Sequence, residues 1–432
     1  MRWTRRARLA VVLVAGAGLL GLSACTNPKK TPPYVCESGA ATTPPTDEAA
    51  ATSSEPLTVE EAGEEAKVAV AEAEVLTPEG DVPLVTVEQT PAGPEIVSTP
   101  VADAAEAEAV AEAAAADGDL VTVEPDSLVS AEGMPFPNDA FYPQQYVFDQ
   151  IPFVETWTAY GGGINGPGAG AGQVVAVLDT GVQASHPELD DGRVMPGLSY
   201  RPPEEGTAQQ DLSYNGHGTA VAGIITAETD NGAGVAGAAP AADIMPIKVL
   251  NPNGQGLTSQ VAQAVVFAAD YPPVTVINLS LGGPNPSDVL HGAIRHAVNT
   301  KGKPVIAASG NSGKCGNPSY PAAFAEVLAV GAINSGYQWA SFSTTGPYVD
   351  VVTAGQGVKT LSTGAPPYTE KSGTSFAAPY AAAAAAIVHA RYPAFNAGQV
   401  YGRLTGTATD LGAPGWDPHF GSGVINVILA AG

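Results

Sequence analysis

The chain has 432 residues and a formal net charge of −25. Its length exceeds that of one typical domain, so two or three structural units are expected. The acidic balance disfavours nucleic acids and anionic membrane surfaces as partners. The three cysteines include no Cys-x-x-Cys pair, which argues against both a disulfide framework and a structural zinc site. Cys315 lies in a glycine-rich loop, where we expect an unpaired thiol.

Residues 1–24 have the pattern of a signal peptide, because four arginines precede a short apolar run. The segment 22–25, Leu-Ser-Ala-Cys, resembles a bacterial lipobox, which predicts that Cys25 is lipidated; ordinary secretory cleavage nearby is the alternative. Either route exports the protein, as a lipoprotein on the outer face of the cell membrane or as a secreted product. Residues 25–56 are rich in Pro, Thr, Ser and Ala and are predicted to be a disordered tether.

Residues 57–132 alternate between helix and strand patterns, which is enough for a small α+β unit. The alternative is a low-complexity linker, because the pieces are short and poor in apolar residues. In chain order we expect a helix over 58–74, strands over 83–87 and 95–98, a helix over 103–117 and a strand over 119–123.

From residue 138 to residue 432 the composition changes: glycine becomes frequent, acidic runs stop, and apolar strands alternate with helices. Buried strands of this kind, separated by helices, favour a parallel sheet that is covered on both faces. About 290 residues fit one such α/β domain. Strands are expected over 173–178, 274–281 and 304–308, and helices over 219–226, 259–269, 290–300 and 377–391.

Four polar residues lie just past a buried strand or at the start of a helix, where open α/β sheets bind ligands. Asp179 and Asn311 follow apolar strands, His217 lies between two glycines at a helix start, and Ser375 precedes an alanine-rich helix. Singly, they fit turn residues, a structural histidine and an N-cap serine. Together they supply a nucleophile, a base, an orienting carboxylate and an oxyanion donor. We expect the helix N-terminus to lower the pKa of His217.

Three motifs resemble the signatures of the subtilisin-like serine peptidases, the subtilases. They occur in the family's Asp, His, Ser order: Asp179-Thr180-Gly181-Val182, His217-Gly218-Thr219-Ala220-Val221-Ala222-Gly223 and Gly373-Thr374-Ser375-Phe376-Ala377-Ala378-Pro379. The resemblance covers residues 138–432. It implies a three-layer α/β fold with a mostly parallel sheet and helices on both faces, and a serine endopeptidase that works through an acyl-enzyme. It makes Asp179, His217 and Ser375 catalytic and places Asn311 in the oxyanion hole.

The resemblance also implies where a substrate binds. One wall of the family's cleft corresponds to Ser280, Leu281, Gly282 and Gly283. Glycines there leave backbone groups free to pair with an extended peptide. The opposite wall of the pocket for the P1 side chain corresponds to Ala308, Ser309 and Gly310. Because no acidic residue obviously lines this pocket, an apolar or aromatic P1 residue is expected.

In the subtilase family a propeptide that ends in a helix and a strand precedes the mature enzyme. By this resemblance, residues 57–132 are an inhibitory propeptide, and the chain is a zymogen that is cut near 131–134. Its partners are then its own propeptide and polypeptide substrates, with a membrane reached only through the lipid on Cys25. The chemistry requires no cofactor. A structural calcium is implied at Glu188, Asp230 and Asn231, whose oxygens are hard ligands.

Two other classes of protein compete with this interpretation. A catalytically inactive, lipid-anchored binding protein could share the fold, but all four catalytic positions are filled. An esterase or lipase needs a Gly-x-Ser-x-Gly motif, whereas Ala377 stands at the second glycine. Phe376 and Tyr380 replace the family's usual methionine and histidine, at positions expected to pack without touching the catalytic chemistry.

Overall fold

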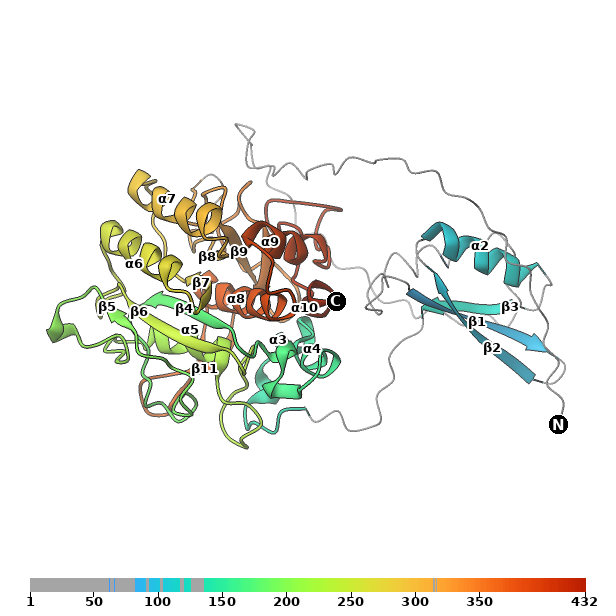
Figure 1. The fold of residues 1–432 in the computed structure, drawn as a ribbon, viewed down its shortest axis with the longest axis horizontal. Helices are drawn as coiled ribbons and strands as arrows, with labels where there is room; N and C mark the ends of the chain where they lie inside the picture. Colours follow the sequence, from blue (N-terminus) through green and yellow to red (C-terminus); the bar gives the residue numbers. More distant parts are fainter. Residues whose placement is uncertain are drawn as a thin grey trace.

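The computed structural model describes the chain from residue 136 to the C-terminus, apart from residues 314 and 316 (Figure 1). Before residue 136 it describes Ala62, Ala66, 82–90, 93–101, 104–116 and 120–125. The expected signal peptide, the tether and the cleavage site near 131–134 lie outside the described residues. So does most of the helix expected over 58–74, of which Ala62 and Ala66 are helical and buried. Within the described residues, no helix combines the length and the apolar character needed to cross a membrane.

The N-terminal unit contains a three-stranded antiparallel sheet and a helix. The strands lie in the order β2-β1-β3, with β1 paired to both neighbours: β1 (Val82–Thr90), β2 (Gly93–Val101) and β3 (Leu120–Pro125). Helix α2 (Ala104–Ala115) buries Ala107, Ala111 and Ala115, whose spacing of four residues places them on one helix face. These four elements have the type and order that the sequence predicts.

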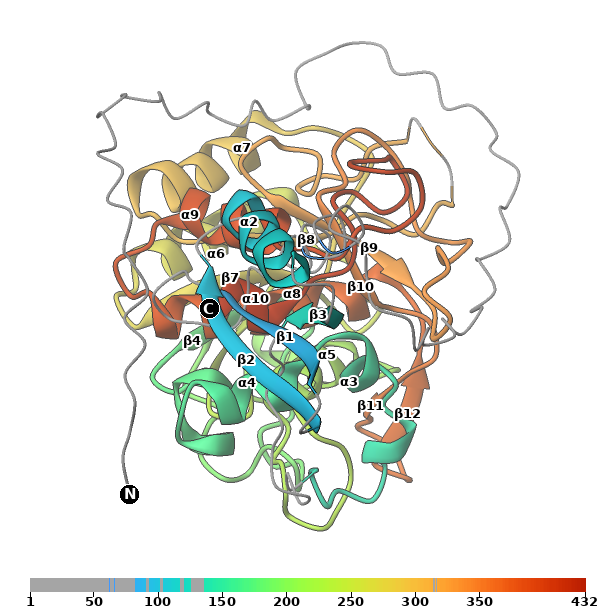
Figure 2. The same ribbon diagram turned by 90° about the vertical axis from the view of Figure 1, so that its right-hand side faces the viewer.

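A seven-stranded sheet forms the centre of the main domain, in the order β10-β9-β8-β7-β4-β6-β5 (Figure 1). Every neighbouring pair is parallel, which confirms the predicted fold class. The strands are β4 (Val174–Asp179), β5 (Leu198–Ser199), β6 (Asp243–Lys248), β7 (Val274–Leu279), β8 (Val305–Ala308), β9 (Leu328–Ile333) and β10 (Val351–Ala354). An antiparallel pair, β11 (Val358–Leu361) and β12 (Tyr368–Lys371), lies at the edge of the domain (Figure 2).

Helices cover both faces of this sheet. One face carries α5 (His217–Thr226) and α8 (Thr374–Arg391), and the other carries α6 (Thr258–Asp270) and α7 (Asp288–Arg295). Shorter α-helices are α3 (Val147–Gln150), α4 (Phe153–Ala159), α9 (Ala397–Gly406) and α10 (Val427–Ala431). Helix α7 continues as a π turn over His296–Thr300, and 3-10 turns occupy Tyr142–Gln144, Gly163–Asn165, Pro167–Ala169 and Pro203–Glu205.

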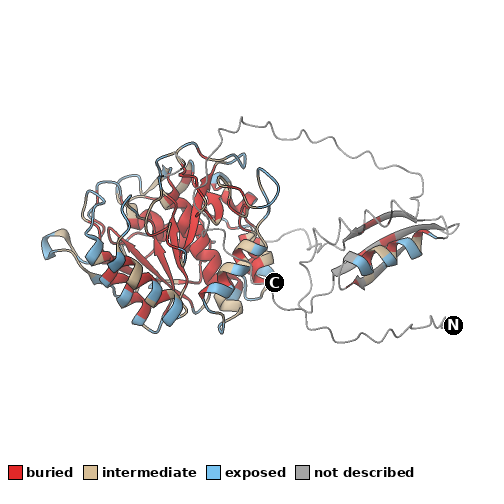
Figure 3. Ribbon diagram, turned by 90° about the horizontal axis from the view of Figure 1, so that it is seen from above, coloured by how far each residue is buried: buried red, intermediate tan, exposed pale blue. Residues whose placement is uncertain are grey.

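The strands bury side chains on both faces, as a covered parallel sheet requires. In β4, Val175 and Val177 belong to the core under α5 and α8. Val174, Ala176 and Leu178 belong to the core under α6 and α7. Because side chains alternate along a strand, the unbroken apolar run from Val174 to Leu178 places β4 between two helix layers. The buried interior is visible along the strands in Figure 3.

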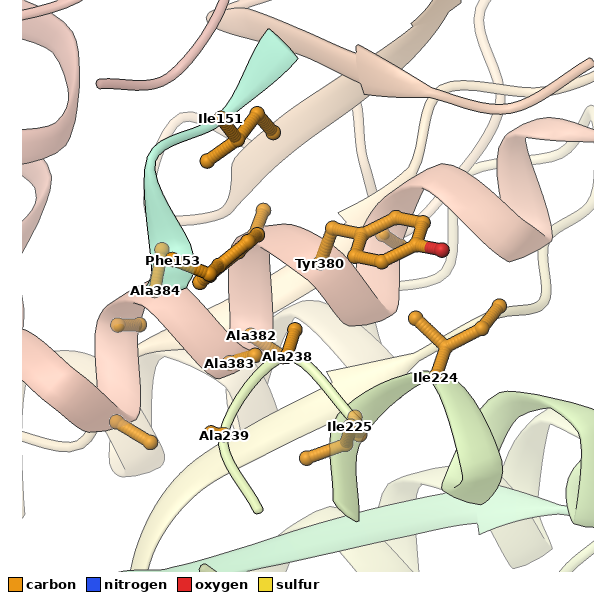
Figure 4. Close-up of a cluster of buried hydrophobic side chains, with 14 of the residues drawn as sticks. Ile151, Phe153, Ile224, Ile225, Ala238, Ala239, Tyr380, Ala382, Ala383 and Ala384 are labelled. Atoms are coloured by element: carbon orange, nitrogen blue, oxygen red, sulfur yellow. The ribbon is translucent and has the colours of Figure 1, made fainter. Parts of the chain in front are cut away.

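Helix α8 lies in the core, and its run from Ala381 to Ala386 is fully buried. The small alanine side chains let its backbone approach the sheet closely. Tyr380 lies beside Phe153 with 6.2 Å between ring centroids, near Ile224 (Figure 4). The helix begins at Thr374 rather than at the predicted residue 377, so Ser375 lies inside its first turn.

Candidate active site

The polar residues predicted to act together lie at one edge of the sheet, near strand β4. In the sheet, β6 and β5 lie on one side of β4, and β7, β8, β9 and β10 lie on the other. The order in which successive strands are added to the sheet therefore reverses at β4. Asp179 is the last residue of β4, Ser280 follows β7, and Asn311 lies three residues after β8. In open α/β sheets, ligands bind at this reversal of strand order, outside the carboxyl ends of the strands.

Asp179 and His217 form a close pair. The Nδ1 atom of His217 lies 2.8 Å from Oδ1 and 2.9 Å from Oδ2 of Asp179. A carboxylate only accepts hydrogen bonds, so Nδ1 carries the proton and donates it, which leaves Nε2 as a free base. Asp179 is fully buried, and its Oδ1 also accepts a 2.7 Å hydrogen bond from the backbone N–H of Thr180. That second bond fixes the rotation of the carboxylate.

The pKa of His217 departs from its ordinary value in the direction opposite to our expectation. Burial works to lower the pKa of His217, but the charge and hydrogen bond of Asp179, with the charge of Asp211, outweigh burial and raise it. The prediction was wrong because it counted only the positive end of α5. Two carboxylates near the imidazole stabilise its protonated form. This stabilisation is larger than the destabilisation of the protonated form by burial and by the helix end.

Ser375 is the second residue of α8, where backbone N–H groups have no partner within the helix. Gly373 precedes that helix with φ 153°, a conformation that L side chains rarely adopt. Asn311 accepts hydrogen bonds at Oδ1 from the N–H and the hydroxyl of Thr374, at 2.8 and 3.0 Å. Its Nδ2 therefore faces the same turn, 3.4 Å from where a Cβ of Gly373 would lie.

A cavity of about 810 Å³ joins these groups, since His217, Asn311 and Ser375 all line it. Among the described residues, no hydrogen bond links the imidazole of His217 to the hydroxyl of Ser375. Such bonds are often long in ligand-free sites and shorten when substrate binds. The centroid of the Phe376 ring lies 5.3 Å from that of the His217 ring, so Phe376 packs against the imidazole of His217.

The predicted substrate walls are only partly exposed to this cavity. Residues that line it include Ser280, Leu281, Gly282, Gly283, Ala308 and Gly310. Ser309 is fully buried and does not line it; its hydroxyl donates to the carbonyl of Thr344. The Ser280 hydroxyl donates to the carbonyl of Ser375 at 2.7 Å, so it holds the backbone of this residue.

The backbone of Gly283 is not free for a substrate, contrary to our expectation. Its N–H and C=O exchange hydrogen bonds with Tyr320, at 2.9 and 2.8 Å. Sequence reasoning also missed the rim after β6, which lines the cavity with Asn253, Gly254, Gln255 and Gly256. Two glycines separated by one residue were the available signal, but β6 itself was not predicted, so the loop had no place in the fold.

The predicted calcium residues lie near buried carboxylate oxygens that lack donors. Glu188 is fully buried; Tyr368 donates to its Oε1 at 2.6 Å, and its Oε2 has no partner. Asp139, which the sequence prediction missed, is buried with Oδ1 unpartnered. Burial, the main cause, raises the pKa of Glu188 to about 7 and raises that of Asp139. Asn231 interacts with the Glu188 side chain.

This group of oxygens fits a hard cation, because unpartnered buried carboxylates are costly unless a charge offsets them. Within the described residues, no three His, Cys, Asp or Glu side chains converge on one point. Amide and backbone oxygens would therefore have to complete any coordination shell. Asp230 has φ 65°, and its Oδ1 accepts a bond from the N–H of Asn138.

Cys315 is disulfide-bonded, so the prediction of an unpaired thiol was wrong. It lies in the loop between Asn311 and Tyr320, both of which line the cavity. The other two cysteines of the chain lie outside the described residues. Sequence reasoning could not find this bond, because cysteine connectivity cannot be deduced from spacing alone.

Residues 170–423 match the family model for subtilases, Peptidase S8, and the chain belongs to this family. It is 42% identical over 261 residues to subtilisin Savinase of Lederbergia lenta, covering 60% of this chain and 91% of that protein. It is 41% identical over 279 residues to a thermostable alkaline protease of Halalkalibacterium halodurans, covering 64% of this chain and 71% of that one.

A solved protease structure from Pseudoalteromonas arctica has the same fold, with a TM-score of 0.59 and 28% identity. The likeness covers 68% of this chain and 98% of that one. The chain is therefore a serine-type endopeptidase, a hydrolase whose substrates are polypeptides.

Proposed function

We propose that this peptidase cleaves peptide bonds with Ser375 as nucleophile, His217 as general base and Asp179 as the orienting acid. The hydrogen bonds between His217 Nδ1 and Asp179 carry this proposal, because they leave Nε2 unprotonated beside a cavity that Ser375 also lines. Ser375 Oγ attacks the scissile carbonyl carbon while its proton passes to His217. The leaving amine takes that proton, and water then hydrolyses the acyl ester by the same route.

The negative oxygen of the tetrahedral intermediate needs two donors. The side-chain NH₂ of Asn311 is one, since its oxygen is already held by Thr374. The backbone N–H of Ser375, in the first turn of α8, is the second. Donors that are held in position before the reaction stabilise a charge that develops only in the transition state. Such stabilisation is usually the largest single contribution to the rate enhancement.

The cleft favours an extended substrate with an apolar P1 residue. No Asp, Glu, Lys or Arg belongs to the described residues that line the cavity. Small residues at Gly282, Ala308 and Gly310 leave space for an apolar or aromatic side chain. Among the described residues, the backbone groups of Gly282 and Gly256 have no hydrogen-bond partner, so they are available to pair with a peptide as an added strand.

We propose that the enzyme is an exported zymogen. Residues 1–24 are its signal peptide, Cys25 its lipidation site, 25–56 its tether and 57–132 its propeptide, followed by the peptidase domain over 138–432. The antiparallel sheet and helix before residue 126 support the propeptide assignment, because an inhibitory domain needs a fold of its own. The lipid then holds the zymogen at the outer face of the membrane.

A serine-directed sulfonyl fluoride tests the nucleophile. We expect one covalent adduct, mapped by peptide mass spectrometry to Ser375, together with loss of hydrolysis of a peptide substrate with an apolar P1 residue. An adduct on another serine, or full activity in the labelled protein, would overturn the proposed triad. N-terminal sequencing of the exported protein tests the cleavage near 131–134.

Replacing Gly218 with alanine is expected to lower kcat/KM by at least about 100-fold. A Cβ at this position would lie 2.1 Å from the carbonyl oxygen of Gly181 and 3.1 Å from Cβ of Asp179. The start of α5 must then shift, which would move the His217 imidazole away from its position between Asp179 and Ser375. Hydrolysis rates and circular dichroism of the variant are the measurements.

Gly292→Ala is the matched control, because Gly292 is also helical and a Cβ there has nothing within 4 Å. We expect it to keep wild-type kcat/KM and to gain about 0.5–1 kcal/mol of stability. Wild-type kcat/KM in Gly218→Ala would contradict the close approach of α5 to the end of β4.

We propose a structural calcium at Glu188, Asp230 and Asn231, with backbone oxygens completing the shell, which would supply stability and take no part in the reaction. Chelation is expected to lower the melting temperature by about 5–10 °C, the value for a ligand present at about 100 times its Kd. Calcium but not magnesium should restore it, because magnesium demands a smaller octahedral shell. Differential scanning calorimetry of wild type and Glu188→Gln is the measurement; an equal response in the variant would exclude this site.

A further inference from the structure

Asp211 lies next to the elements that carry the Asp179–His217 pair and stands outside the three motifs identified in the sequence. It is a loop residue before α5 and is only 5% exposed. Its Oδ1 accepts hydrogen bonds from the Thr180 hydroxyl at 3.0 Å and from the N–H and hydroxyl of Ser213 at 3.1 and 2.6 Å. Its Oδ2 accepts from the N–H and hydroxyl of Thr219, at 3.0 and 2.9 Å.

These bonds join the two elements that carry the catalytic pair. Thr180 follows Asp179 at the end of β4, and Thr219 lies in the first turn of α5, two residues after His217. The Thr180 hydroxyl also accepts from the N–H of Gly218 at 3.0 Å. One carboxylate therefore fixes the distance and rotation between the strand end and the helix start.

Asp211 also completes the N-terminus of α5, whose N-cap is Gly216 and lacks a side-chain cap. Three orphan N–H groups of the first turn find acceptors in this network. The N–H of His217 donates to the Ser213 hydroxyl at 3.2 Å, that of Gly218 to the Thr180 hydroxyl, and that of Thr219 to Asp211 itself. A negative charge at this end of a helix is stabilised by the helix dipole.

The charge of Asp211 reaches the imidazole. The charged groups that act on His217 are Asp179 and Asp211, which raise its pKa, and Lys371, which lowers it. Asp211 makes no contact with the cavity, so it touches neither substrate nor reacting atoms. Its effect on the reaction must pass through His217 and Asp179.

We propose that Asp211 is a positioning residue that locks α5 against the end of β4 and sets the orientation of the catalytic histidine. The inference rests on the proposed triad. It assigns to the loop before α5 a role in the rate of the chemical step, with substrate binding left to the cavity residues.

Asp211→Asn tests the proposal, because asparagine keeps the shape but loses the charge and one acceptor. We expect kcat to fall roughly 10- to 100-fold, as for lost hydrogen bonds to a charged group, with KM within about twofold of wild type. The acid limb of the kcat/KM profile should shift to lower pH, because a nearby negative charge that raises the pKa of His217 has been removed. Asp191→Asn is the matched control, since Asp191 pairs with Arg193 outside the cavity lining.

Thr180→Val separates the effect of positioning on kcat from the effect of the Asp211 charge. It also tests the proposal if Asp211→Asn does not fold. It removes the link from β4 to Asp211 and keeps the carboxylate, so kcat should fall while the acid limb stays in place. Wild-type kcat and an unmoved acid limb in folded Asp211→Asn, or wild-type kcat in Thr180→Val, would overturn the proposal. Labelling of Ser375 by sulfonyl fluoride in the same preparations shows whether the triad itself stands, so the two failures are distinguishable.

Discussion

Ser375→Ala is expected to lower kcat by on the order of 10⁶-fold, the magnitude found for the nucleophile in subtilisin. In the proposed mechanism the Ser375 hydroxyl attacks the substrate, so its loss removes the acyl-enzyme route entirely. The residual rate over water comes from the oxyanion donors and from substrate binding. The Ser280 hydroxyl holds the backbone carbonyl of residue 375, so this contact survives the substitution and the site keeps its geometry.

Hydrolysis of a chromogenic peptide with an apolar P1 residue is the measurement, and substrate affinity should be nearly unchanged. Ser372→Ala is the control, because Ser372 lies in the same stretch but uses its hydroxyl only to accept from the N–H of Gly357. The variant should also accumulate uncut at the proposed 131–134 junction if maturation is autocatalytic. A kcat within tenfold of wild type would rule out Ser375 as the nucleophile.

Asp179→Asn is expected to lower kcat by about 10⁴-fold at neutral pH, as the same change does in a serine protease of another fold. The N–H of Thr180 needs an acceptor at Oδ1, so the new amide nitrogen would occupy the other position, which faces His217 Nδ1. The imidazole would then carry its proton on Nε2, where it cannot accept one from Ser375.

The same change removes the carboxylate that raises the pKa of His217. The acid limb of kcat/KM should therefore move to lower pH, because the base is deprotonated when pH exceeds a smaller pKa. A pH profile of the variant beside Asp191→Asn is the measurement. An unchanged limb, or a loss smaller than tenfold, would show that Asp179 does not orient the base.

Much of the fold follows from local patterns. Strand β4 is apolar from Val174 to Leu178 and was predicted within one residue, because burial on both faces leaves a continuous run. Strand β6, Asp-Ile-Met-Pro-Ile-Lys, was not predicted, since Pro246 and two charged ends are atypical of a central strand. Only pairing with β4 and β5 makes it a strand, and pairing is not visible in one sequence.

The residues of the candidate site also fall into those that the sequence could predict and those that it could not. Asp179, His217, Asn311 and Ser375 could be proposed because each stands in a motif beside a strand end or helix start. Asp211 could not be, because its role exists only where two distant segments meet. The direction of the His217 pKa failed for the same reason: the helix end was visible in the sequence, and the two carboxylates facing the ring were not.

The disulfide at Cys315 constrains the loop between Asn311 and Tyr320. Both of these residues line the cavity. Reduction of this bond would therefore loosen one wall of the cavity, so a reducing environment would act on peptide hydrolysis through the shape of the cleft.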